Sequence, residues 1–248
     1  MLSKAQIKYI QSLQHKKYRQ KSGQFIAEGD KIVPELLLEA VPVREVYATE
    51  VWISTHEQLL ASRKEVRVTP VEEGILKQLS ALTTPNQALA LLDMPAPAEI
   101  KPELFKGKVT LALETIQDPG NLGTIIRIAD WFGIRQIVCS PDCVDVYNPK
   151  TIQATMGSVA RVRVLETEIA PFLDLAGLPS YAATLHGRNI VEFQKLEEGI
   201  ILIGNESRGL SEGVIAAATH KVTIPRLGGA ESLNAGVAAG IICGRLLI

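Results

Sequence analysis

Three stretches in the second half of the sequence place polar side chains and glycines directly after apolar, strand-like runs. The first stretch spans residues 114–123 and reads ETIQDPGNLG. Its Asp-Pro-Gly piece favours a tight turn. Asn121 falls where a helix is expected to start, which suits a capping amide, and Arg127 follows within that helix. A surface arginine is the plain interpretation of Arg127, and a guanidinium that binds a phosphate bidentately is the chemical one.

The second stretch, residues 202–210, reads LIGNESRGL and begins at the end of a buried strand. Gly204 lets the backbone approach a ligand closely. A carboxylate at Glu206, directly beyond a buried strand, is costly unless it has a partner. The stretch therefore indicates either a ligand-binding loop or a capping loop for the next helix, with Ser211 as the N-cap residue.

The third stretch, residues 224–234, reads IPRLGGAESLN and combines a strand end, a glycine pair and a helix start. Ser232 is a suitable N-cap residue, which places Asn234 inside the first helical turn. The helix after it begins with the small residues AGVAAG at 235–240. Such a surface allows close packing, either within a tight core or against a chain that passes close by.

No phosphate-binding glycine fingerprint accompanies the first stretch. It contains neither Gly-x-Gly-x-x-Gly nor a phosphate loop of the Walker type, which counts against a nucleotide-binding dehydrogenase or hydrolase. Because an open α/β sheet binds its ligand at the carboxyl ends of its strands, the three stretches are expected to form one site.

Together the three stretches resemble the three motifs of SpoU (TrmH-type) RNA methyltransferases, a branch of the SPOUT superfamily. The motifs are Asn-Leu-Gly followed by Arg, then Gly-Asn-Glu, then Ile-Pro with Ser-Leu-Asn, and their order and spacing agree. The resemblance runs from Lys108 to the C-terminus. The first ninety or so residues resemble the small α/β substrate-binding domain often found ahead of it, including KYR at 17–19 and FIAEG at 25–29.

The resemblance implies an S-adenosylmethionine-dependent enzyme that methylates a ribose 2′-hydroxyl of transfer RNA or ribosomal RNA. It also implies an α/β catalytic domain with a deep trefoil knot, working as a homodimer without a metal. By position, Gly204, Ile224 and Leu233 would line the cofactor. The sequence stops at Ile248 without a basic tail, so no such tail is expected to contribute to RNA binding.

Five residues would then carry the chemistry. Methyl transfer to a hydroxyl needs in-line alignment and loss of the hydroxyl proton. Asn121 would orient the ribose or the arginine. Arg127 would bind the phosphate next to the target oxygen rather than act as the base, because a guanidinium hardly deprotonates in a protein. Glu206 would orient the polar groups around it, while Ser232 and Asn234 would place the hydroxyl or the cofactor tail.

A catalytically inactive RNA-binding protein that keeps the fold is the alternative hypothesis. The presence of all five polar residues counts against it, and a measurement of cofactor binding discriminates between the two. Because a ribose 2′-hydroxyl distinguishes RNA from DNA, the substrate class follows from the reaction. The sequence identifies neither the RNA nor the modified nucleotide.

Basic residues cluster near the N-terminus, where no acidic residue precedes Glu28. Tyrosines lie among them, and this combination suits a surface that meets phosphates and unstacked bases. A solvated first helix with its tyrosines in the core explains the same pattern equally well. On the first interpretation, the RNA contacts of this region are Lys16, Lys17, Arg19 and Lys21.

The composition is that of an ordinary globular protein, with 46% hydrophobic and 21% charged residues and a net charge of −1. No apolar run approaches twenty residues, and the N-terminus lacks a secretory signal, so no membrane partner is predicted. The three cysteines, at 139, 143 and 243, cannot all pair, which favours the cytoplasm. Their spacing predicts buried or loop thiols rather than a zinc site.

Residues 94–102 carry three prolines and predict an extended linker. We therefore predict a small α/β RNA substrate-binding domain at 1–94, a linker at 95–105 and the methyltransferase domain at 106–248. The first domain is predicted to have strands at 23–29, 43–47, 66–69 and 87–92, and helices at 31–39, 56–63 and 72–79. In the second, near-continuous apolar strands between helices indicate a mainly parallel sheet. Its strands are predicted at 109–113, 136–139, 161–165, 181–184, 199–203 and 221–224, and its helices at 122–132, 149–159, 210–219 and 233–247.

Overall fold

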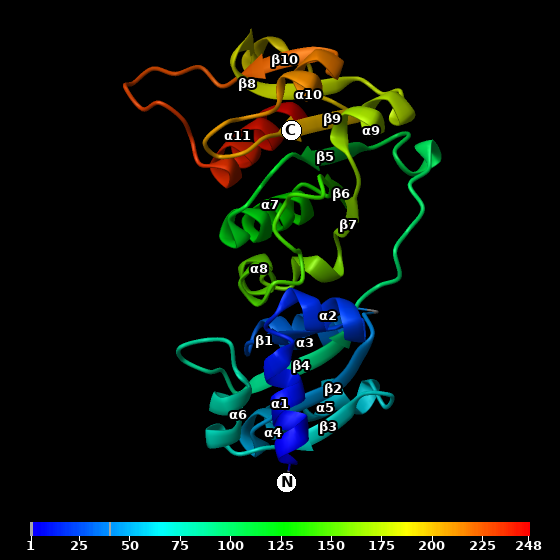
Figure 1. Ribbon diagram of the computed structural model, residues 1–248, viewed down its shortest axis with the longest axis vertical. Coiled ribbons are helices and arrows are strands. Elements are labelled where there is room, and N and C mark those ends of the chain that lie inside the picture. Colours follow the sequence, from blue (N-terminus) through cyan, green and yellow to red (C-terminus); the bar gives the residue numbers. More distant parts are fainter. Residues whose placement is uncertain (1, 40) are drawn as a thin grey trace. The chain divides into compact units, whose positions relative to one another are not determined.

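The computed structural model describes residues 2–39 and 41–248. Their contacts divide the chain into two compact units (Figure 1). The first comprises Met1–Ala96 and Asp145–Arg161, and the second comprises Pro97–Val144 and Val162–Ile248. Met1 and Ala40, which fall inside the predicted first domain, lie outside the described residues. The predicted domain boundaries stay a prediction. The predicted second domain includes residues 145–161, which these contacts group with the first unit.

The first unit is a four-stranded sheet covered by helices on both faces. The strand order is β1-β4-β2-β3, antiparallel except for the parallel pair β2 and β3. Alternation along β1 explains the two faces: Phe25 and Ala27 join one apolar cluster, and Ile26 joins the other. Its elements are α1 Lys4–Ser12, α2 Lys16–Ser22, β1 Gln24–Glu28, α3 Ile32–Leu38, β2 Val43–Ala48, α4 Glu50–Thr55, α5 Glu57–Ser62, β3 Arg67–Pro70, α6 Glu73–Leu79, β4 Ala88–Asp93, α8 Pro149–Thr155 and η2 Ser158–Ala160.

The segment 145–161 joins the first unit through apolar packing and an ion pair. Ile152 is buried in the cluster that contains Phe25, and the ring of Tyr147 lies 4.7 Å from that of Phe25. Asp145 pairs with Arg19 of α2. The chain of the second unit therefore leaves its own sheet after β6, contributes α8 to the first unit, and returns at β7.

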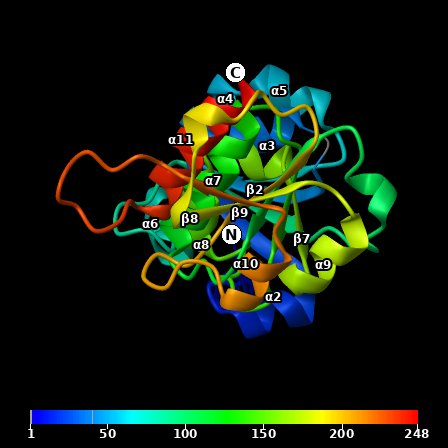
Figure 2. The ribbon, with the colours of Figure 1, turned by 90° about the horizontal axis from the view of Figure 1, so that it is seen from above.

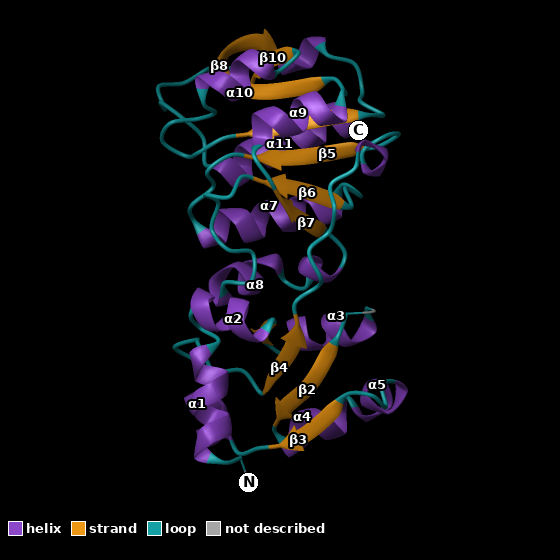
Figure 3. Ribbon diagram, turned by 45° about the vertical axis from the view of Figure 1, so that its right-hand side comes forward, coloured by secondary structure: helices purple, strands orange, loops and turns teal. Residues whose placement is uncertain are grey.

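The second unit is a six-stranded parallel sheet with the order β10-β8-β9-β5-β6-β7. Its strands and helices alternate along the chain (Figure 3). This confirms the predicted α/β class and parallel sheet, whereas the predicted trefoil knot stays a prediction. The elements are η1 Pro102–Leu104, β5 Val109–Leu113, α7 Pro119–Trp131, β6 Gln136–Cys139, β7 Arg163–Glu166, α9 Ile169–Ala176, β8 Ser180–Asn189, η3 Ile190–Glu192, β9 Gly199–Ile203, α10 Glu212–Ala217, β10 His220–Thr223 and α11 Ala235–Leu247.

Helices cover both faces of this sheet, which explains why its central strands β5, β6 and β9 are almost wholly buried. Every residue of β9 is buried. Ile200 and Leu202 join a cluster with α9 and α10, so the alternate residues of β9 face the opposite layer. On that layer α11 packs on α7 and β9, and α7 packs on β6.

Small residues of α11 let it pack closely against α7. A Cβ atom built at Gly236 would lie 3.0 Å from Thr124, one at Gly240 would lie 3.6 Å from Ile128, and one at Gly244 would lie 3.7 Å from Phe132. Both sets of residues recur every four positions, the spacing of one helix face. The small residues after Asn234 therefore form a tight helix seam, one of the two alternatives that the sequence left open.

The strand order places the first two polar stretches next to each other. The third stretch follows β10 at the edge of the sheet and has to span back to them. β5 lies between β9 and β6, so the loops after β5 and β9 leave the same edge of the sheet side by side. β10 is an edge strand, separated from β9 by β8. The exposed loop after it, residues 225–234, reaches away from the sheet before α11 begins (Figure 2). The α7–α11 seam then returns the start of α11 to the start of α7.

Three helix starts differ from the prediction by two or three residues, and one of them is α10, which begins at Glu212 rather than at residue 210. α7 begins at Pro119, because Asp118 rather than Asn121 is its N-cap and accepts a hydrogen bond from the Asn121 N–H. α11 begins at Ala235, because Asn234 rather than Ser232 is its N-cap. In the part of the chain that the structure describes, no helix is long and apolar enough to cross a membrane.

Candidate active site

A chain of amide hydrogen bonds connects all three polar stretches. The side-chain oxygen of Asn234 accepts from the backbone N–H groups of Gly236 and Val237, which leaves its Nδ2 free to donate elsewhere. Nδ2 of Asn234 donates to Oδ1 of Asn121 at 2.7 Å. Nδ2 of Asn121 in turn donates to Oε1 of Glu206 at 2.8 Å. Each amide uses both of its ends, and the chain terminates on a carboxylate, where a hydrogen bond is strongest.

Further hydrogen bonds hold the loop after β9 against the loop after β5. Asn205 donates through Nδ2 to the carbonyl of Thr115 at 2.9 Å. The carboxylate of Glu114 accepts from both the backbone N–H and the hydroxyl of Ser211, each at 2.7 Å. Ser211 is also the N-cap of α10, as predicted. The capping interpretation of this loop is therefore confirmed, and the same loop is held against the loop after β5.

Gly204 is required by the protein's own backbone. A Cβ atom at this position would lie 2.3 Å from the carbonyl carbon of Gly209 and from the nitrogen of Leu210. The two ends of the loop are pinched together there, and Asn205 and Gly209 exchange backbone hydrogen bonds. The sequence indicates that a ligand approaches this glycine closely, and the structure adds a steric constraint within the loop itself.

A cavity of about 680 Å³ opens beside this loop. That volume suits a drug-sized or cofactor-sized ligand. Gly204, Ile224 and Leu233, the three predicted cofactor contacts, all line it. Its wall also includes the apolar side chains of Ile203 at the end of β9, Leu210 in the loop after β9 and Ile242 on α11.

One wall of the cavity comes from a bulge in β8 that the sequence analysis missed. β10 pairs with β8 up to Lys221 and Ala182, and pairing resumes at Val222 and Arg188. The intervening residues 183–187 leave the ladder, and Ala183–His186 line the cavity. An isolated glycine within a strand-like run, here Gly187, is the signal that could have indicated such a bulge.

Thr184 in this bulge has a buried hydroxyl that needs a partner. Its Oγ1 makes no hydrogen bond with any residue that the structure describes. Thr184 lines the cavity, and an unpaired buried hydroxyl is unfavourable. A ligand with polar groups would satisfy it, so the cavity fits an occupant that is part apolar and part polar.

The two remaining predicted catalytic residues stand apart from the amide chain. Arg127 lies on an exposed part of α7, and its guanidinium makes no hydrogen bond or ion pair within residues 2–39 and 41–248. Ser232 is exposed in the loop before α11 and lines the cavity. The structure thus brings Asn121, Glu206 and Asn234 into contact and leaves Arg127 and Ser232 open to an incoming molecule.

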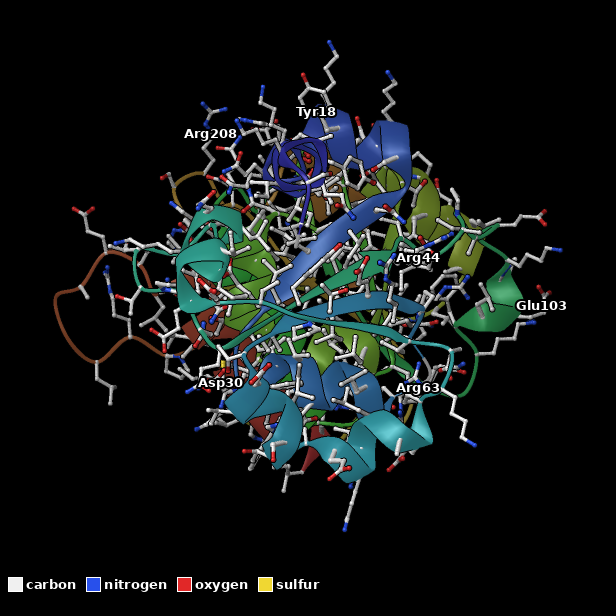
Figure 4. All side chains as sticks on the ribbon, turned by 90° about the horizontal axis from the view of Figure 1, so that it is seen from below. Tyr18, Asp30, Arg44, Arg63, Glu103 and Arg208 are labelled. Atoms are coloured by element: carbon white, nitrogen blue, oxygen red, sulfur yellow. The ribbon has the colours of Figure 1, made fainter. Side chains whose placement is uncertain are left out.

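The predicted RNA contacts of the first unit divide into two kinds. Lys16, Lys17 and Lys21 are exposed on α2, and Tyr18 between them is 46% exposed (Figure 4). This excludes the alternative in which that tyrosine is in the core. Arg19 differs from the prediction, because its side chain is only 2% exposed.

The Arg19 side chain is buried in the interior of the first unit, where its donors are engaged. Its guanidinium pairs with Asp145 at 2.5 Å and donates to the carbonyls of Leu13 and Gln14. Because these groups use its donors, we remove Arg19 from the candidate RNA contacts.

The cysteines are free and buried, as the sequence predicted, at 139, 143 and 243. Hydrogen bonding from Cys139 lowers the pKa of the Cys143 thiol to about 7. Its sulfur accepts a hydrogen bond from the backbone N–H of Ile116 at 3.3 Å. Within the described residues, no group of His, Cys, Asp and Glu side chains could hold a metal ion.

Comparison with known proteins identifies the family. The SpoU rRNA Methylase family matches residues 108–244, which is more than half of the chain. The chain belongs to the SpoU family. An MRM3-like substrate binding domain matches residues 4–90 of this SpoU protein. The 23S rRNA (guanosine(2553)-2′-O)-methyltransferase RlmP of Bacillus subtilis is 28% identical over 242 residues, covering 95% of this chain and 93% of its own.

Solved structures agree over the full length of the SpoU protein. A TrmH-family protein from Porphyromonas gingivalis superimposes with a TM-score of 0.86 and 35% identity, covering 100% of this chain and 98% of its own. An AdoMet-bound rRNA methyltransferase from Sinorhizobium meliloti gives a TM-score of 0.87 and 28% identity, covering 99% and 95%. These findings confirm the predicted family, the RNA ribose 2′-O-methyltransferase activity and S-adenosylmethionine as the cofactor.

The pinch at Gly204 generates a prediction for the SpoU protein. Gly204→Ala should lower both thermal stability and S-adenosylmethionine affinity, because its Cβ would collide with backbone that cannot yield without moving the loop. Calorimetry measures both quantities. Gly213→Ala is the matched control, since nothing lies within 4 Å of its added Cβ, and it should keep wild-type affinity. Normal stability and binding in Gly204→Ala would show that the loop tolerates a Cβ atom at this position.

Proposed function

We propose that this SpoU enzyme methylates a ribose 2′-hydroxyl of ribosomal RNA, using the site built around Asn121. The observation that carries the proposal is the amide chain from Asn234 through Asn121 to Glu206, which joins three loops beside one cavity. The relative RlmP, which this chain matches over nearly its whole length, is described as acting on a guanosine of 23S rRNA. That name supports ribosomal RNA over transfer RNA, the two classes left open by the sequence.

The cavity is the proposed cofactor site. The close-packed backbone at Gly204, the apolar side chains of Ile224 and Leu233, and the unsatisfied hydroxyl of Thr184 would hold S-adenosylmethionine. The cofactor supplies a methyl group on a sulfonium, which is the electrophile of the reaction. The protein's own contribution is to align the ribose oxygen with that methyl group and to exclude competing water.

The five candidate catalytic residues have distinct proposed roles. Asn121 orients the ribose. Its own amide is held by two hydrogen bonds, one from Asn234 and one to Glu206. Ser232, which lines the cavity, and Asn234, the N-cap of α11, place the hydroxyl. Arg127 has an unengaged guanidinium on an exposed part of α7, so it is free to bind the phosphate beside the target nucleotide. Its charge would favour loss of the hydroxyl proton, and the guanidinium itself stays protonated.

An exposed apolar surface supports the proposed homodimer. Val237 and Ile241 are 51% and 41% exposed on one side of α11, and Trp131 at the end of α7 is 84% exposed. Val237 and Ile241, four residues apart, share one face of α11, and an exposed apolar helix face suits a protein contact. A second copy of the chain is the proposed occupant, as the resemblance to dimeric SpoU enzymes implies. The trefoil knot and the cytoplasmic location belong to the same proposal.

The direct experiment has two arms. Ribose methylation is mapped in total RNA from cells with and without the gene, and the purified protein is assayed with labelled S-adenosylmethionine on the RNA that loses a site. We expect one 2′-O-methyl site in ribosomal RNA to disappear. If no RNA loses a site and calorimetry detects no cofactor binding, the inactive RNA-binding alternative replaces the proposal.

The exposed lysines of α2 generate a second prediction. Changing Lys16, Lys17 and Lys21 to Ala should reduce the slope of log affinity against log salt by about 0.7 to 0.9 for each phosphate that the variant no longer neutralises. Filter binding across a salt series measures the slope. Lys64→Ala is the control, because Lys64 is exposed elsewhere on the first unit. An unchanged slope in the triple variant would show that these lysines form only a solvated face.

Arg127 generates the third prediction. Arg127→Ala should reduce single-turnover methyl transfer by roughly a hundredfold, the scale of a group that assists proton loss, with little change in cofactor affinity. Arg127→Lys should rescue poorly, because lysine keeps the charge but lacks the planar fork. Arg135→Ala is the control, since Arg135 is exposed just before β6, at the amino end of the strands. Wild-type rates in Arg127→Ala would exclude the residue from the mechanism.

A further inference from the structure

Thr115, the second residue after β5, has an unusual backbone conformation. Its φ is 58°, and among the described residues the other non-glycine position with positive φ is Met156. The left-handed region is unfavourable for a β-branched side chain. Such a conformation persists only where the surroundings hold it in place, and it occurs preferentially at functional sites. The contacts of Thr115 show what holds it.

All three polar groups of Thr115 are bound, and two of them bind the turn after β6. Its backbone N–H donates to Oγ of Ser140 at 2.8 Å, and its hydroxyl donates to Oδ2 of Asp142 at 2.6 Å. The hydroxyl of Ser140 also donates to Oδ1 of Asp142 at 2.5 Å. These hydrogen bonds from Ser140 and Thr115 lower the pKa of the Asp142 carboxyl. We call Ser140 and Asp142 the β6 clamp.

The third polar group of Thr115 reaches the loop that carries Glu206. The Thr115 carbonyl accepts from Nδ2 of Asn205 at 2.9 Å. Oδ1 of Asn205 accepts from the backbone N–H groups of Ser207 and Arg208, so this one side chain shapes the loop around Glu206. The direction of the Thr115 carbonyl therefore bears on where the Glu206 carboxylate stands.

We propose that Thr115 is a positioning residue for methyl transfer. The β6 clamp holds Thr115 in its left-handed conformation, so that its carbonyl fixes Asn205 and the Glu206 carboxylate lies where it accepts a hydrogen bond from Asn121. The proposal rests on the function proposed above. It assigns to Ser140 and Asp142, which do not line the cavity, a part in the reaction that they exert through Thr115. Displacements of about 1 Å remote from the chemistry are enough to lower a rate strongly.

A double-mutant cycle tests the proposal, because glycine adopts positive φ without strain. Asp142→Ala should lower kcat about tenfold, while the KM for S-adenosylmethionine stays within about threefold because Glu114 and Ser211 still hold the loop. Thr115→Gly should lower kcat modestly. In the Thr115→Gly background, Asp142→Ala should cost less than about threefold, since no strained conformation then needs the clamp. Thr115→Ser should stay close to wild type.

A matched control separates positioning from general stability. Thr219 makes a comparable pair of bonds to Ser180, accepting from its N–H at 2.6 Å and donating to its carbonyl at 2.8 Å, at the amino end of β8. Thr219→Ala should lower thermal stability and leave kcat unchanged. If Asp142→Ala keeps a wild-type kcat, or costs the same factor in both backgrounds at Thr115, the proposal is overturned.

Hydrogen exchange of the full-length protein, measured without cofactor or RNA, keeps this test independent of the proposed function. Asp142→Ala should speed exchange at the amides of Ser207 and Arg208, which Asn205 protects. Faster exchange in a protein that transfers no methyl group would refute the proposed function and support the clamp. Unchanged exchange in an active protein would refute the clamp alone.

Discussion

The amide of Asn121 is the interaction on which the site depends. Its oxygen accepts from Asn234 and its nitrogen donates to Glu206, and a single side chain thereby joins the loops after β5, β9 and β10. The strand order supplies only part of this convergence, since β10 lies at the sheet edge. The glycine seam between α7 and α11 supplies the rest. Without close contact between these helices, Asn234 at the start of α11 would not reach Asn121 in the first turn of α7. The loop after β10 would then make no hydrogen bond to the other two loops through Asn234.

Much of this arrangement follows from the sequence alone. The strands 109–113, 136–139 and 199–203 are apolar runs of strand length, and the structure places β5, β6 and β9 at the same bounds. Their continuity indicated a sheet buried on both faces, which is what parallel strands require. Asn121, Glu206 and Asn234 were expected at one site because loops after parallel strands leave the same edge, and the structure brings them into contact.

The remaining features depend on contacts that no local pattern shows. Arg19 sits in a basic run, yet its partner Asp145 is distant in sequence, so its burial was not visible. The bulge at 183–187 arises from a register shift against β10. Helices α4 and α9 were missed, since each is short and is stabilised by packing rather than by propensity. The left-handed Thr115 was equally hidden, because threonine gives no signal for positive φ.

The most direct test of the account asks whether the amide chain works as one unit. Single-turnover methyl transfer is measured for Glu206→Ala, Asn234→Ala and the double variant, with cofactor and RNA saturating. Residues that act as a unit give strongly non-additive effects. We expect each single change to slow transfer about a hundredfold and the double variant to be less than about tenfold slower than the slower single one. Multiplicative losses in the double variant would contradict it, because Glu206 and Asn234 would then contribute independently of Asn121.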